Sequence, residues 1–128
     1  MREGGPILEQ ALPYVSRDNV VVAMVQRALV DQKKIRAGAQ KAERALAPDV
    51  IRILFSFDEN WVGEVSLYFR IVISDDAAKP ARLRESTQRI IARVSREIKA
   101  DDLGLETYFN FRSRSEQEEL KDPLWERE

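Results

Sequence analysis

Two neighbouring stretches of alternating apolar and polar side chains constrain the fold of this chain more than any other feature. Residues 50–57 and residues 64–74 both place apolar side chains at every second position. This period of two is typical of β-strands that bury one face. The residues between them, Asp58–Gly63, include Asn60 and Gly63, at which we expect unusual backbone angles. The sequence therefore predicts a β-hairpin with a loop that is longer than minimal.

A long segment with helical periodicity precedes the hairpin. Apolar residues recur at spacings of three, four and seven from residue 16 to residue 47, and Pro48 ends the predicted helix. Gly38 lies inside this segment and costs about 1 kcal/mol relative to alanine, so we expect a kink or a break there. One prediction is that this helix packs on the sheet. The alternative is that it docks on another chain, with Val25 and Ile35 in the contact.

The rest of the chain predicts a second helix, a third strand and a short third helix. Residues 81–100 have the apolar spacing of a half-buried helix, and residues 105–113 alternate like the first two strands. Ser115 and Glu118 fit a capping box that begins the short helix, which ends near Pro123. Because a strand–helix–strand step makes its two strands parallel, the third strand lies beside either the first or the second.

The predicted fold class is α+β, with a small three-stranded mixed sheet and the order helix, strand, strand, helix, strand, short helix. At 128 residues the chain fits a single domain, expected at residues 16–128 after an N-terminal arm at residues 1–15. Within it we expect a long helix at 16–47, a sheet with a helix at 50–113, and a short helix with an acidic tail at 115–128. Residues 116–128 carry six acids and two bases, whereas residues 16–47 carry seven bases and three acids, so these segments can neutralise each other.

The composition removes most catalytic chemistry. The chain has no cysteine and no histidine, which excludes disulfides, thiolate nucleophiles and Ser-His-Asp triads. A carboxylate-only metal site stays open. However, the hairpin places Asp58 near Glu64 and carries Asp75 and Asp76 to the opposite end of the sheet. We therefore expect no enzyme activity, no cofactor and no metal site, and the lack of a long apolar stretch or signal peptide predicts a cytoplasmic protein without a membrane partner.

Four arginines form one face of the second predicted helix. They are Arg82, Arg89, Arg93 and Arg96. At about 100° per residue they fall within roughly 60° of one another, away from the apolar stripe. Such a row can follow the phosphates of a nucleic acid or bind an acidic partner. The alternative is a solvated face on which Glu85 and Glu97 pair with some of the arginines.

The sheet face opposite the second helix carries aromatic and polar side chains. They are Tyr68, Arg70, Tyr108, Asn110 and Arg112. Aromatics interleaved with arginines on an open sheet resemble a platform on which bases stack. Because a small sheet that is open on one side is poorly stable, we expect the N-terminal helix to cover this face. Trp61 in the hairpin loop and Trp125 near the C-terminus are either binding anchors or parts of the core.

The segment from Tyr108 to Gln117, with the sequence YFNFRSRSEQ, resembles a segment of small uncharacterised bacterial proteins. The hairpin segments 52–58 and 69–75 add to this resemblance, which covers roughly residues 51–125. Such proteins accompany all-helical partners of the HEPN type, a domain frequent among toxin ribonucleases. The resemblance implies an accessory or antitoxin-like role, and it identifies no catalytic residues.

The sequence leaves three functional hypotheses. The first is a non-enzymatic protein that binds another chain or itself, with the candidate contact residues Val25, Ile35, Trp61, Tyr108, Arg112 and Trp125. The second is an RNA- or DNA-binding domain of KH-like or ribosome-assembly-factor-like topology, although the Gly-x-x-Gly loop of KH domains is absent. Its candidate residues are Arg82, Arg89, Arg93, Arg96, Tyr68 and Arg70. The third is an enzyme that uses carboxylates and a metal ion.

Overall fold

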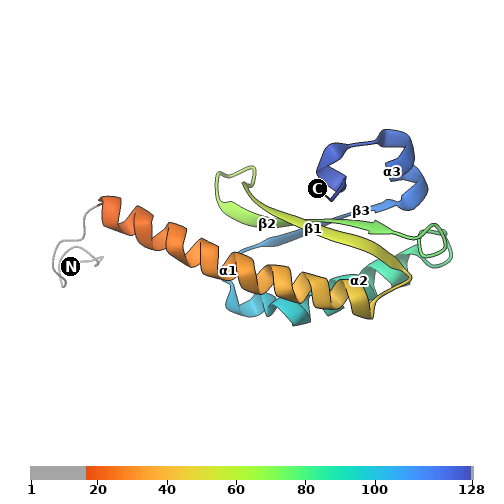
Figure 1. Cartoon of the computed structure of the whole chain (residues 1–128), viewed down its shortest axis with the longest axis horizontal. Helices are drawn as coiled ribbons and strands as arrows, with labels where there is room; N and C mark the ends of the chain where they lie inside the picture. Colours follow the sequence, from red (N-terminus) through yellow and green to blue (C-terminus); the bar gives the residue numbers. More distant parts are fainter. Residues whose placement is uncertain (1–16, 128) are drawn as a thin grey trace. The chain divides into compact units, whose positions relative to one another are not determined.

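The computed structural model describes residues 17–127, with side chains from residue 31 onward. The elements are helix α1 (Arg17–Ala45), strands β1 (Val50–Glu59) and β2 (Val65–Ile73), helix α2 (Leu83–Ile98), 3-10 helix η1 (Ala100–Asp102), strand β3 (Thr107–Ser113), helix α3 (Arg114–Leu120) and 3-10 helix η2 (Pro123–Trp125) (Figure 1). The chain divides into two compact units between Lys33 and Lys34, and the second unit contains the sheet. The predicted α+β class and element order are confirmed. The predicted arm and the side chain of Val25 lie outside the described residues.

The three strands form one mixed sheet in the order β1-β2-β3. The central strand β2 pairs antiparallel with β1 and parallel with β3. Phe69 of β2 lies opposite Phe55 of β1 and Phe109 of β3, and its ring stacks on that of Phe109 with the centroids 5.0 Å apart. The sequence did not determine which strand β3 joins, and the structure places it beside β2.

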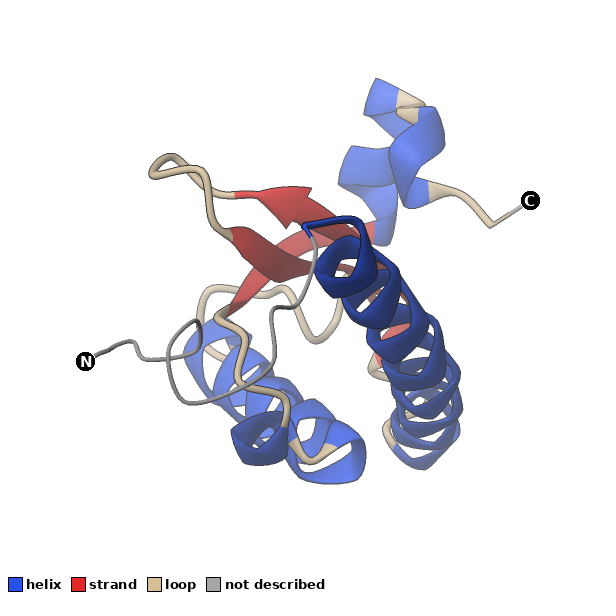
Figure 2. Ribbon diagram, turned by 90° about the vertical axis from the view of Figure 1, so that its left-hand side faces the viewer, coloured by secondary structure: helices blue, strands red, loops and turns tan. Residues whose placement is uncertain are grey.

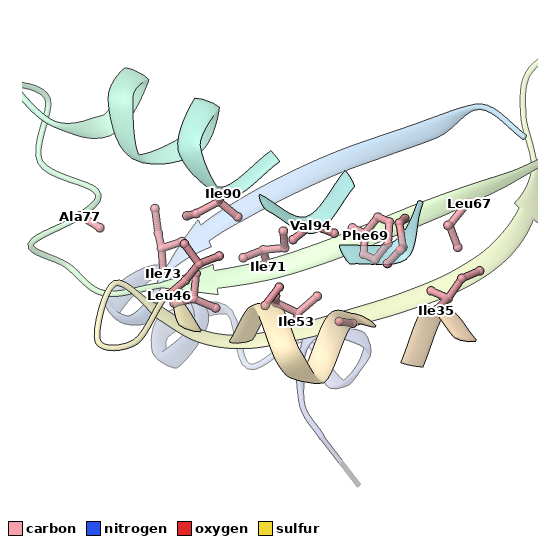
Figure 3. Packing of buried hydrophobic residues seen from close by; sticks show 14 residues of the cluster. Ile35, Leu46, Ile53, Leu67, Phe69, Ile71, Ile73, Ala77, Ile90 and Val94 are labelled. Carbon is pink, nitrogen blue, oxygen red and sulfur yellow. The ribbon is translucent and has the colours of Figure 1, made fainter. Parts of the chain in front are cut away.

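Residues 34–45 of α1 and helix α2 pack on the same face of the sheet, and α3 lies on the other side (Figure 2). The buried cluster joins Ile35, Ala39, Ala42 and Leu46 of α1, Leu67, Phe69, Ile71 and Ile73 of β2, and Ile90, Val94 and Ile98 of α2 (Figure 3). The prediction that the N-terminal helix covers the opposite face is therefore wrong for residues 34–45. One helix, about 10 Å wide, is too narrow to cover three strands with large side chains on both edges.

Gly38 brings the two helices together and does not interrupt α1. The helix is continuous from Arg17 to Ala45, so the expected kink or break is wrong. A Cβ atom at Gly38 would lie 2.8 Å from the carbonyl oxygen of Glu97 and 3.0 Å from Cγ2 of Ile98. The missing side chain therefore makes room for the backbone of α2, and the cost in helix propensity is offset by packing between the helices.

Helix α3 begins directly at the end of β3. The Ser113 hydroxyl accepts a hydrogen bond from the backbone N–H of Glu116 at 3.1 Å, and Glu116 Oε1 accepts one from the N–H of Ser113 at 2.9 Å. This is a capping box, so the predicted box from Ser115 to Glu118 starts two residues too late. Ser115 instead donates from its N–H and its hydroxyl to the carboxylate of Asp75, at 3.0 and 2.5 Å. These two hydrogen bonds join α3 to the loop after β2.

Candidate protein-interaction surface

The loop between β1 and β2 is held by the side chain of Asn60, which is buried. Asn60 Oδ1 accepts hydrogen bonds from the N–H groups of Val62 and Glu64 at 3.1 and 3.0 Å, and its amide donates to the Ser66 hydroxyl at 3.3 Å. Gly63 has a φ of +84°, which confirms the expected unusual backbone angle there. The same expectation is wrong for Asn60, because this residue shapes the loop through its side chain.

Three exposed apolar side chains lie in this loop and at the first residue of β2, and we call them the hairpin tip. The exposed fractions are 92% for Trp61, 53% for Val62 and 52% for Val65. Trp61 therefore does not pack on the core, and its role as a binding anchor stays a prediction. The carboxylates that flank the hairpin tip along the chain are also exposed, and they belong to Asp58, Glu59 and Glu64. The hairpin tip is therefore an apolar patch with an acidic rim.

Tyr68 and Tyr108 stand next to each other on the open face of the sheet. Their ring centroids are 4.9 Å apart with an interplanar angle of 16°, which matches the spacing of neighbouring strands. One face of each ring is therefore covered by the other ring. The Tyr108 hydroxyl donates to Glu106 Oε1 at 2.5 Å, and this carboxylate raises the pKa of Tyr108.

The C-terminal cap, residues 114–127, covers the other end of this face. The guanidinium of Arg112 lies 4.3 Å from the ring centroid of Trp125 and donates to Gln117 Oε1 at 3.0 Å. Arg52 of β1 donates to the carbonyl oxygen of Trp125 at 2.9 Å. Trp125 and Gln117 are buried. Arg112 and Trp125 thus hold the C-terminal cap on the sheet, and Trp125 is not accessible to a partner in this conformation.

Arg82 at the start of α2 and two of the three arginines predicted further along this helix form ion pairs within the chain. Arg82 and Arg89 both bind the carboxylate of Asp49, with Arg82 Nη2 at 3.0 Å, and Arg93 Nε lies 2.8 Å from Glu97. Burial raises the pKa of Asp49, but hydrogen bonds from Arg89 and Arg82 lower it more, so the net shift is downward. The structure therefore favours the alternative of a solvated, acid-paired face.

Only one of the two glutamates predicted to pair with these arginines does so. Glu97 pairs with Arg93 as expected, whereas Glu85 makes no ion pair among residues 31–127. Arg96 also makes none within this part of the chain, and it lies along a groove of about 510 Å³ between the end of α1 and α2. Asp49, which follows Pro48 in the sequence, was missed because it is far from α2 along the chain.

The other predicted site residues lie apart from the hairpin tip. Ile35 is fully buried in the core. The strand register confirms that Asp58, opposite Ser66, lies at one end of the hairpin and Asp75 follows its other end. The described part of the chain contains no cluster of three or more side chains that could coordinate a metal ion.

Comparison of the chain with models of protein families, with curated proteins and with solved structures gave no match. None of the helices in the described part of the chain combines the length and the apolar composition that a membrane span requires.

Proposed function

We propose that the chain is a non-enzymatic protein-interaction module that binds a partner chain through the hairpin tip. The observation that carries this proposal is Trp61, exposed on a loop whose backbone is already fixed by Asn60. A tryptophan that enters a pocket buries about 150–250 Å². Because the loop is ordered before binding, little conformational entropy is lost when the pocket closes around it.

The acidic rim indicates the chemistry of the partner. Exposed Asp58, Glu59 and Glu64 favour an apolar pocket surrounded by lysine or arginine. A ribonuclease must carry basic residues to hold its RNA, so an antitoxin-like role beside such an enzyme is consistent with this rim. The choice of this partner class rests on the resemblance of residues 51–125 to proteins that accompany HEPN-type partners.

Nucleic-acid binding is a second proposal with weaker support. Arg70 and Asn110 lie on the open sheet face, and Arg96 lines the groove on α2. Against it, Arg82, Arg89 and Arg93 are already paired with carboxylates. If nucleic acid does bind, a gel-shift assay should show an affinity that falls steeply with salt concentration. No shift at low salt contradicts this second proposal.

The experiment that tests the first proposal is a capture assay from a lysate of the source cells, with the full chain and the variant Trp61→Ser as baits. We expect Trp61→Ser to lose the captured partner and to keep the melting temperature of the parent protein, because the side chain makes almost no contact within the chain. The purified partner should then bind the parent chain at least tenfold more tightly than the variant.

Leu124→Ser is the matched control, since Leu124 is another apolar side chain that is 64% exposed but belongs to the C-terminal cap. This control should keep full binding. Equal capture by the parent chain and Trp61→Ser contradicts the assignment of the hairpin tip as the binding surface.

A further inference from the structure

The two edges of the sheet differ in how they are covered. At the β1 edge, the N–H of Ile53 donates to Glu43 Oε1 of α1 at 2.8 Å, and Arg127 also binds that carboxylate, at 2.6 Å. At the β3 edge, no hydrogen bond to the outward backbone groups of Phe109 or Phe111 occurs within residues 17–127. The strand β3 also carries no proline or lysine, the residues with which natural edge strands avoid pairing.

The backbone pattern of β3 shows which of its groups face outward. Leu67 of β2 donates to the carbonyl oxygen of Glu106 at 2.9 Å, and the parallel register pairs Leu67 with Thr107. In a parallel ladder the alternate residues of β3 then point their N–H and C=O groups toward β2. The groups of Phe109 and Phe111 therefore point away from β2, in position to bond a further strand.

From this free edge we infer that a second copy of the chain pairs with β3 in antiparallel orientation, with the two-fold axis at Asn110. In this register Phe109 lies opposite Phe111 of the second copy and exchanges two backbone hydrogen bonds with it. Tyr108 lies opposite Arg112 of the second copy, whose guanidinium stays stacked on Trp125 of its own chain. The strand is thus self-complementary on the face that meets the core, where aromatic side chains lie opposite aromatic side chains.

Charge complementarity extends this register beyond the strand. One residue beyond each end of β3, the same register brings exposed Glu106 toward exposed Arg114 of the second copy, the first residue of α3, and the two-fold axis repeats this contact. Within one chain these residues have different neighbours. Glu106 accepts a hydrogen bond from Tyr108, and Arg114 lies near Asp75. Glu106 and Arg114 form no ion pair with each other within residues 31–127 of one chain.

A groove beside the free edge has room for the second copy. It has a volume of about 670 Å³ and lies between β3 and the first half of α2, with Leu83, Ile91 and Phe111 among its lining residues. Leu83 is 41% exposed, and Phe111 is only partly buried. In the inferred pairing, Phe109 of the second copy comes next to Phe111 and enters this groove. The sheet becomes six-stranded, and its apolar layer becomes continuous.

A single cysteine at the two-fold axis tests this pairing, because the chain has no cysteine of its own. Opposed residues of a pair without backbone hydrogen bonds have Cα atoms about 4.5 Å apart, which a disulfide can bridge. We expect Asn110→Cys to form a covalent dimer under mild oxidation. Gln40→Cys, an exposed position on α1, serves as the control and should stay monomeric. Equal cross-linking of the two variants overturns the inference.

Charge reversal tests the same register without cross-linking. We expect the parent chain to have about twice its monomer mass of 14.8 kDa in light scattering. Glu106→Arg and Arg114→Glu, made singly, should each reduce this mass to that of the monomer, and the double variant should restore the dimer. Monomeric parent protein, or a double variant as weak as the single ones, overturns the inference. Trp61→Ser should leave the dimer intact, so failure here is distinguishable from failure of the proposed hairpin-tip function.

Discussion

At the scale of single residues, Gly38 shows that packing between helices can reverse a helix-propensity effect. In an exposed helix, Gly→Ala stabilises by about 1 kcal/mol. Here the added methyl group would lie 2.8 Å from a backbone oxygen of α2, and the backbone cannot rotate away as a flexible side chain can. We expect Gly38→Ala to lower the free energy of unfolding by about 1–3 kcal/mol, the usual cost of overpacking. Urea denaturation followed by circular dichroism measures this difference.

Gln40→Ala is the matched control for this prediction, because residue 40 is exposed on the same helix. The free energy of unfolding of Gln40→Ala should differ from that of the parent by no more than about 0.5 kcal/mol. If Gly38→Ala stabilises the protein, α1 and α2 do not approach as closely as the structure indicates.

At the scale of elements, the C-terminal cap depends on the planar guanidinium of Arg112. This group stacks on Trp125 and donates to Gln117. Lysine has the same charge, but it lacks the planar shape and the several N–H donors of the guanidinium. We expect Arg112→Lys to cost about 1 kcal/mol or more, in the range of a desolvated cation–π contact with a lost hydrogen bond. The midpoint of urea unfolding measures the effect.

Arg84→Lys provides the comparison, since Arg84 is exposed and makes no ion pair within residues 31–127. Equal midpoints for Arg112→Lys and Arg84→Lys contradict a specific role for the stacked guanidinium.

The elements themselves were predictable from the sequence where the signal is local. Alternation at residues 50–57 and 64–74 gives the hairpin correctly, because burial of one sheet face repeats every second residue. A bulge between Val50 and Arg52 was not predictable, and it brings Val50 into the core. The start of α3 was misplaced because Ser113 and Ser115 both fit a capping sequence, and only the contact of Ser115 with a distant carboxylate separates them.

The candidate surface was predictable only where its residues have a local signal in the sequence. Trp61 and the tyrosines were identified from their places on a loop and a strand face. The sequence could not show that Trp61 is exposed and Trp125 buried, since that depends on where Arg112 and the cap lie in three dimensions. The arginines of α2 gave a misleading signal, because their main acid partner, Asp49, is distant along the chain.

At the scale of the whole molecule, a few carboxylates join segments that are far apart in sequence. Asp49 connects the end of α1 to α2 through Arg82 and Arg89, and Asp75 connects β2 to α3 through Ser115. Hydrogen bonds from Ser115 lower the pKa of Asp75, and those from the two arginines outweigh burial in lowering the pKa of Asp49. Acid should therefore loosen these long-range connections together.

The sign of the pH dependence follows from these shifts. A carboxylate with a lowered pKa in the folded state binds protons more readily when unfolded, so it stabilises the fold above its unfolded pKa and loses this effect as pH falls. The ordinary value for aspartate is 3.8. We expect stability to be nearly constant from about pH 7 to pH 5 and to decrease as pH falls through and below 3.8. Urea midpoints across this range, for the parent and Asp49→Asn, measure the effect.

The difference in urea midpoint between the parent and Asp49→Asn should be largest near neutral pH and decrease in acid, because protonated Asp49 no longer attracts Arg82 and Arg89. Asp101→Asn is the control, since Asp101 is exposed and makes no ion pair among residues 31–127. Its difference from the parent should be small at every pH. If the difference in urea midpoint between the parent and Asp49→Asn stays constant as the pH falls, the two arginines do not stabilise the charged carboxylate. Helix α2 is then held on the sheet by its apolar side chains alone.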